Sequence, residues 1–180
     1  MADLAAFPNN LDDKHFRCCA IIETPKNRRN KFDYDPDSGL FRLAGLLPEG
    51  MAFPFDFGFI PSTLGEDGDP LDVMVLLDEP AHVGCLLDVR IVGVIEADQT
   101  QDGKTERNDR LLAVAIHSYS HDDVSSIDDL SKTFLQQVEQ FFVSYNKLRG
   151  KKFKIRGCGG PKRALAVIHK GIKAFKKKKG

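Results

Sequence analysis

The first three quarters of the chain consist of short apolar or alternating runs that turn residues separate. Residues 18–22 form an apolar run, and residues 31–35 alternate charged and aromatic side chains with the period of a half-buried strand. The turn at residues 36–39 predicts a hairpin whose second arm begins at Leu40. Further strands are expected over residues 53–60, 73–77, 86–95 and 111–116, with Gly58 at a bulge or a close backbone approach.

The pattern becomes helical towards the end of the chain. An apolar stripe predicts a helix over residues 126–148, with Ser126 and Asp129 as its capping pair. Pro161 opens a second helix, the alternating residues 151–156 resemble an edge strand, and residues 176–180 form a basic tail that we expect to be frayed. The order of elements predicts an α+β, mainly β protein: one domain over residues 1–180, built as a closed β-barrel flanked by two C-terminal helices.

Composition narrows the functional classes. The 180 residues include 26 basic and 26 acidic side chains, a balance that argues against a dedicated nucleic-acid binder. Aspartates are concentrated between Asp56 and Asp123, and the chain is strongly basic from Lys147 onward. There is no signal-peptide pattern and no apolar run long enough for a membrane span. The four cysteines show no C-x-x-C spacing, so we interpret them as reduced thiols and expect a cytoplasmic location.

The segment 67–72, Asp-Gly-Asp-Pro-Leu-Asp, places three carboxylates in a rigid turn just before an apolar strand. Carboxylates this close raise one another's pKa values unless a cation compensates them. Hard oxygen ligands favour Mg²⁺, with Mn²⁺ as a substitute, over Zn²⁺. An EF-hand is excluded, because its sixth and twelfth positions would be Asp72 and Asp78 rather than Gly and Glu. A merely polar turn remains an alternative on spacing alone.

Residues 66–75, EDGDPLDVMV, resemble the signature of the soluble family I inorganic pyrophosphatases. The resemblance continues in order along the chain at residues 20–25 (AIIETP), 31–33 (KFD), 54–60 (PFDFGFI), 91–94 (IVGV), 111–114 (LLAV) and 141–145 (FFVSY). It implies an OB-like five-stranded barrel that binds Mg²⁺ ions around pyrophosphate, and a homo-oligomer, commonly a hexamer.

The resemblance also implies roles for individual residues. It makes Asp69 the group that positions or deprotonates the attacking water. The metal ligands it implies are Asp67 and Asp72, with Glu23 as a metal-associated acid, and the set is completed by Asp98, Asp102 or Asp109. The substrate-binding residues it implies are Lys31, Asp33, Arg110 and Tyr145, and we add Arg42 and Lys147 as the cations nearest to two family positions that this sequence changes.

The phosphate-binding end departs from the family pattern. The family's phosphate-binding arginine falls on Ala44 or Gly45, so that Arg42 is the nearest guanidinium in sequence. Phenylalanines at 53 and 57 replace tyrosines, Asn108 aligns with the second metal aspartate, Arg110 aligns with a lysine, and the Tyr-Lys pair becomes Tyr145-Asn146 with Lys147 one step on. Three hypotheses therefore stay open: an inorganic pyrophosphatase, a paralogue that cleaves an organic diphosphate or nucleoside triphosphate, and a catalytically weak phosphate-binding or regulatory protein.

Overall fold

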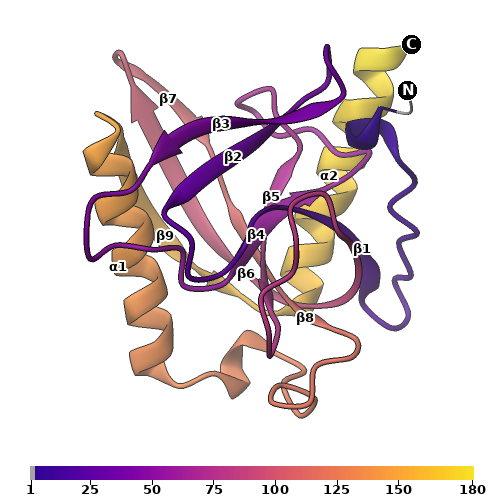
Figure 1. The fold of residues 1–180 in the computed structure, drawn as a ribbon. Helices are drawn as coiled ribbons and strands as arrows, with labels where there is room; N and C mark the ends of the chain where they lie inside the picture. Colours follow the sequence, from indigo (N-terminus) through magenta and orange to yellow (C-terminus); the bar gives the residue numbers. More distant parts are fainter. Residues whose placement is uncertain (1–2) are drawn as a thin grey trace.

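The computed structural model describes residues 3–180 and contains mostly β-strands, with two α-helices near the C-terminus (Figure 1). Its elements, in chain order, are η1 (Leu4–Ala6), β1 (Arg17–Thr24), β2 (Asn30–Asp35), β3 (Leu40–Leu46), β4 (Asp56–Ile60), β5 (Leu71–Leu76), β6 (Leu86–Gln101), β7 (Lys104–Arg107), β8 (Arg110–Ala115), η2 (Ile127–Asp129), α1 (Lys132–Leu148), β9 (Lys152–Gly159) and α2 (Pro161–Lys179).

Five of the strands close into a ring. Neighbouring strands pair in the order β1, β4, β5, β8 and β6, and β6 then pairs back to β1. The β5–β8 pair is parallel, and the other pairs of the ring are antiparallel. This ring confirms the predicted closed five-stranded architecture. The hairpin β2–β3 forms a separate two-stranded sheet across one end of the ring, and β9 and β7 both pair with the long strand β6 (Figure 1).

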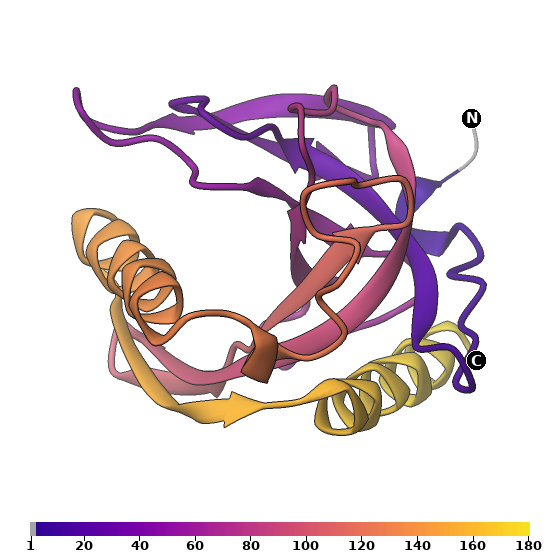
Figure 2. The same cartoon turned by 90° about the horizontal axis from the view of Figure 1, so that it is seen from below.

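The central strands are apolar throughout because both of their faces are covered. In β5, Val73 and Val75 belong to a core cluster that includes Leu165 and Ile168 of α2. The alternate residues, Met74 and Leu76, belong to a second cluster with Phe142 of α1 and its neighbours. The two helices flank β9, which follows α1 and leads into α2 (Figure 2). Each helix therefore buries its apolar stripe against a different face of the same strands.

Gly58 allows β4 to lie close to β1. A Cβ atom built at this position would stand 1.9 Å from the carbonyl oxygen of Ile21. The pairing of the two strands also shifts register between Ile22 and Thr24. The predicted close approach at Gly58 is therefore confirmed, and any larger residue there would separate the two strands.

The predicted start of the first long helix is wrong. Ser126 and Asp129 do form a capping box, but it begins the short 3-10 helix η2. The chain is extended at Leu130, and α1 begins only at Lys132, where the side chain of Ser131 accepts a hydrogen bond from the Phe134 amide. The sequence contains two consecutive capping signals, and the pattern alone assigned the helix to the first.

Two further features differ from the prediction. The helix α2 runs to Lys179, so the basic residues expected to be frayed form its last turn. The strand expected over residues 86–95 continues to Gln101 as β6 and forms a hairpin with β7, in which Gln101 pairs with Lys104 around a turn at Asp102 and Gly103. Within residues 3–180, neither helix is both long and apolar enough to cross a membrane.

Candidate active site

The acidic segment 67–72 forms a tight turn at the start of β5. Gly68 has φ of +92°, a left-handed conformation that favours glycine. The amide of Asp69 donates to Oδ1 of Asp67, and the amide of Gly65 donates to the carbonyl of Asp69. The conformation of Gly68 and these short-range hydrogen bonds therefore fix the positions of Asp67 and Asp69.

Most of the predicted site residues line one cavity of about 700 Å³, which we call the acidic cavity. Those that line it are Glu23, Lys31, Asp33, Asp67, Asp69, Asp72, Arg110 and Tyr145. They come from β1, β2, the acidic turn, β5, β8 and α1, so the closed ring and its flanking helix assemble them from distant segments. The cavity thus brings together acidic and basic side chains, the combination needed to bind metal ions and an anionic substrate.

Buried charges on β1 and β2 form one wall of this cavity. The ammonium group of Lys31 is 3.7 Å from Oε2 of Glu23 and also pairs with the carboxylate of Asp33. Burial raises the pKa of Glu23 to about 7, although Lys31 and the hydrogen bond from the Tyr34 amide oppose the shift. Burial disfavours the charged form of Lys31 as well, but the two carboxylates outweigh it and raise its pKa. Lys31 is therefore a firmly charged cation.

Arg110 brings a second buried cation to the cavity. Its Nη1 atom is 2.5 Å from Oδ2 of Asp72 and also contacts the side-chain oxygen of Asn108. The guanidinium lies over the rings of Phe142 and Phe153, at 5.4 and 5.3 Å. Its Nε atom is buried and has no hydrogen-bond partner within residues 3–180. This guanidinium therefore places a buried positive charge at the wall of the cavity that it lines.

The carboxylates of the turn repel one another. Burial, followed by the charge of Asp72, raises the pKa of Asp67 to about 6. Burial and the charges of Asp72 and Asp33 also raise the pKa of Asp69. Such shifts are typical of catalytic carboxylates and of carboxylates that bind a metal ion.

The donor set fits a hard divalent cation. Within residues 3–180, no three acidic, histidine or cysteine side chains converge closely enough to hold an ion by themselves. Mg²⁺ commonly takes only one or two carboxylates and completes its shell with water and substrate phosphates. The paired oxygens of Asp67 and Asp72 at the cavity wall suit that mode of binding better than an all-protein cage.

Comparison with known proteins identifies the family. The model for the inorganic pyrophosphatase family matches residues 20–176. The chain belongs to this family. The chain is 33% identical to an inorganic pyrophosphatase of Geobacillus stearothermophilus, over 89% of this chain and 94% of that protein. It is 35% identical to one of Synechocystis, over 87% and 90%.

The solved structures agree with this assignment. The crystal structure of the inorganic pyrophosphatase from Thermus thermophilus superposes with a TM-score of 0.87 at 33% identity, and the match covers 97% of this chain and 99% of that one. The predicted fold class and family are therefore confirmed, and this metal-dependent family makes the chain an inorganic diphosphatase.

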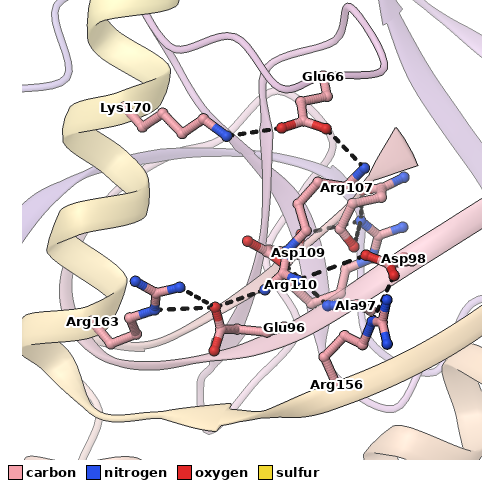
Figure 3. Close-up of polar contacts among 11 residues, drawn as sticks. Glu66, Glu96, Ala97, Asp98, Arg107, Asp109, Arg110, Arg156, Arg163 and Lys170 are labelled. Carbon is pink, nitrogen blue, oxygen red and sulfur yellow. Dashed lines mark hydrogen bonds and ion pairs between the residues drawn. The ribbon is translucent and has the colours of Figure 1, made fainter. Parts of the chain in front are cut away.

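Two of the predicted metal ligands lie apart from the acidic cavity. Asp98 and Asp109 line a second space of about 570 Å³, which we call the outer cavity, and to which Asp67 and Asp72 also contribute. Figure 3 shows both aspartates beside Arg107: Oδ1 of Asp109 is 2.6 Å from its Nε, and Oδ1 of Asp98 is 3.7 Å from its Nη1. Arg156 holds the other oxygen of Asp98 at 2.6 Å.

Strand alternation explains this placement. Asn108 and Arg110 line the acidic cavity, and Asp109 between them lines only the outer one. In the same way Gln99 lines the acidic cavity, whereas Asp98 does not. The amides of Gln99 and Asn108, 3.3 Å apart, therefore stand where the sequence led us to expect carboxylates. Side-chain alternation counted back from Arg110 points to Asn108, whereas Gln99 lies on a different strand, β6.

The remaining predicted residues lie elsewhere. Arg42 on β3 is largely exposed and pairs with Asp35 at 2.6 Å, and it does not line either cavity. Lys147 is exposed in the last turn of α1 and also lies outside both linings. Sequence proximity suggested these two cations, and the structure instead directs Arg149 and Lys151 into the acidic cavity.

Proposed function

We propose that this protein hydrolyses inorganic pyrophosphate to two phosphates with Mg²⁺ as its metal cofactor, Mn²⁺ being a substitute. The observation that carries the proposal is the acidic cavity itself, where the turn carboxylates face buried cations from other elements. Pyrophosphate is multiply anionic, so a nucleophile approaches it only after its charge is neutralised. Bound Mg²⁺ would supply that neutralisation and acidify the attacking water.

The residues of the chain supply binding and proton transfer. Lys31 and Arg110 are cations in the wall, and their positive charges support roles as ligands of phosphate oxygens. The hydroxyl of Tyr145, buried on α1, is a further polar group for the substrate. Asp67 and Asp72 would hold the metal, with Glu23 nearby.

Asp69 is the proposed general base. Its pKa is raised by burial and by Asp72 and Asp33, which makes its carboxylate a better proton acceptor than a solvated one. It lines the acidic cavity beside the proposed metal ligands Asp67 and Asp72. The carboxylate would take the proton of the attacking water and hold that water towards phosphorus.

We also propose a cytoplasmic homo-oligomer, by family resemblance a hexamer. The four cysteines, Cys18, Cys19, Cys85 and Cys158, are all free, which suits a reducing compartment. The side chains of Leu43 and Leu46 on β3 are 62% and 63% exposed, apolar surface of a kind that subunit contacts bury.

The test measures phosphate release from pyrophosphate, a nucleoside triphosphate and an organic diphosphate, each with Mg²⁺ and with EDTA. We expect rapid release from pyrophosphate alone, abolished by EDTA. Asp69→Asn should lower kcat by roughly 10²-fold or more at unchanged Tm, on the scale of losing an essential proton acceptor. Asp123→Asn, at an exposed aspartate outside both cavities, is the matched control. Preferential cleavage of an organic substrate, or no turnover at all, would reject the proposal.

A further inference from the structure

The acidic cavity includes an arginine that the proposed mechanism leaves unused. Arg149 follows the last residue of α1 and lines this cavity. The other lining arginine, Arg110, is paired with Asp72. Within the described part of the chain, residues 3–180, the Arg149 guanidinium has no carboxylate within ion-pair distance, although acids are abundant nearby.

The backbone of Arg149 is held by the end of the helix. Its amide donates to the carbonyl of Asn146, the amide of Gly150 donates to Lys147, and the amide of Lys151 returns to Asn146. Gly150 has φ of +73°, the left-handed conformation typical of the residue that follows a helix. The position from which this arginine extends is therefore fixed by a structured cap.

The direction of the Arg149 side chain is also fixed, by its contacts with Tyr145. Nη1 of Arg149 donates to the hydroxyl of Tyr145 at 3.0 Å, and the guanidinium carbon lies 5.5 Å from the centre of that ring. Tyr145 is itself buried against Phe53 and Phe141. A guanidinium has several N–H donors in a planar fork, so one bond to a hydroxyl leaves others free for an anion.

Gly45 on β3 leaves room for this guanidinium because it has no side chain. A Cβ atom built at Gly45 of β3 would stand 3.6 Å from Nη1 of Arg149, its only neighbour within 4 Å outside the adjacent residues. Gly45 pairs with Lys31, the buried cation of the cavity wall. Arg149 therefore reaches from α1 to the β2–β3 hairpin, beside Lys31, whereas Arg42 on that hairpin is turned to Asp35.

We propose that Arg149 is a substrate-binding residue that, with Lys31, forms a phosphate subsite between the end of α1 and β3. This proposal rests on the proposed function, since it assigns one phosphoryl group of the same substrate. Tyr145 orients the guanidinium, and Gly45 leaves space for it. Planar guanidinium donors match phosphate oxygens in pairs, which a lysine at this position would not reproduce.

The experiment compares Arg149→Ala, Arg149→Lys and Arg17→Ala. Arg17 is an exposed arginine on β1 outside both cavities, so its removal controls for the loss of a surface charge. We expect Arg149→Ala to raise KM for pyrophosphate by roughly 10- to 100-fold, the scale of a charge-assisted hydrogen bond, with a smaller change in kcat. Arg149→Lys should recover only part of this loss, and Arg17→Ala should match the wild type.

A second variant tests the geometry. Gly45→Arg in the Arg149→Ala background returns a guanidinium to the same space from β3, and it should restore much of the lost affinity. Tm of each variant reports whether folding is affected. An unchanged KM in Arg149→Ala, or an equal rise in Arg17→Ala, would overturn the proposal.

Binding measurements separate this proposal from the proposed function. Titration calorimetry with inorganic phosphate and with imidodiphosphate, a non-hydrolysable analogue, needs no turnover. Weaker binding of both in Arg149→Ala supports the subsite even if the wild type does not hydrolyse pyrophosphate. Binding that is equal in the wild type and Arg149→Ala, or absent from both, rejects the subsite even if hydrolysis is rapid.

Discussion

Arg110 and Asp72 lie side by side because two strands distant in sequence pair in parallel. Val73 of β5 pairs with Leu111 of β8, which brings together the residues that precede them, with Nη1 of Arg110 2.5 Å from Oδ2 of Asp72. The side chain of Arg110 is only 5% exposed, and that of Asp72 is 24% exposed. The pair therefore joins a proposed metal ligand to a proposed phosphate ligand in a poorly solvated place.

Removing this buried cation should cost both stability and activity. Arg110→Met keeps much of the packing against Phe142 and Phe153 but leaves the Asp72 carboxylate without its partner. We expect the free energy of unfolding to fall by about 2 kcal/mol, the scale of a charge-assisted hydrogen bond, and kcat/KM to fall by roughly 10²-fold. Urea denaturation and steady-state kinetics measure the two effects. The double variant with Asp72→Asn should regain part of the stability, and strictly additive losses would argue against a coupled pair.

The turn carboxylates should make the stability of the protein depend on Mg²⁺. Asp67 is destabilised by burial and by the charge of Asp72, so Asp67→Asn should be at least as stable as the wild type in EDTA. Added Mg²⁺ should stabilise the wild type by about 2.7 kcal/mol at 100 times its dissociation constant, through mass action. Asp67→Asn should lose most of that gain, whereas Asp123→Asn should keep it. Thermal denaturation against Mg²⁺ concentration gives both results, and an equal Mg²⁺ response in Asp67→Asn would remove it from the ligand set.

The variant Asp109→Asn tests which of the two cavities binds the metal. Its carboxylate accepts the Ala97 amide at 3.0 Å and pairs with Arg107, but burial outweighs both and raises its pKa, so we expect Asp109→Asn to be about as stable as the wild type. The Mg²⁺ concentration that gives half-maximal activity should stay unchanged, because the side chain does not line the acidic cavity. A several-fold rise in that concentration would instead support Asp109 as the ligand that the sequence suggested.

Asp56 should make the stability of the folded protein depend on pH. Burial raises its pKa above the ordinary value of 3.8, and its Oδ2 atom is buried without a partner within residues 3–180. The folded state thus binds this proton more tightly than the unfolded state, so the contribution of Asp56 to stability falls as pH rises from about 4 through the raised pKa.

Asp56→Asn tests this contribution. The amide oxygen can still accept the amide groups of Lys26 and Ala81 that Oδ1 accepts in the wild type. Without a buried charge, we expect the variant to gain about 1 kcal/mol over the wild type at pH 7 and to lose that advantage near pH 4. Denaturation midpoints across this pH range measure the difference. A constant offset between the two proteins at every pH would contradict a titrating Asp56.

Patterns local to the sequence predicted much of the fold. The acidic turn follows from the backbone freedom of Gly68 and the rigidity of Pro70, and the apolar runs of β5 and β8 follow from burial on both faces. The apolar stripe predicts the helix α1, but the first of two successive capping signals gives it the wrong start. Such features depend on interactions between residues close together in the chain, so the sequence alone predicts them.

The tertiary structure decided which charges meet. The parallel pairing of β5 with β8 brings Arg110 to Asp72, and strand alternation sends Asp109 to the outer cavity while Asn108 and Arg110 line the acidic one. The packing of α1 against the ring brings Arg149 to the space beside Gly45. By itself the sequence determined an acidic metal-binding turn within a pyrophosphatase-like order of strands. The identity of the cations opposite that turn depends on strand pairing and helix packing between residues far apart in the chain, which no local pattern encodes.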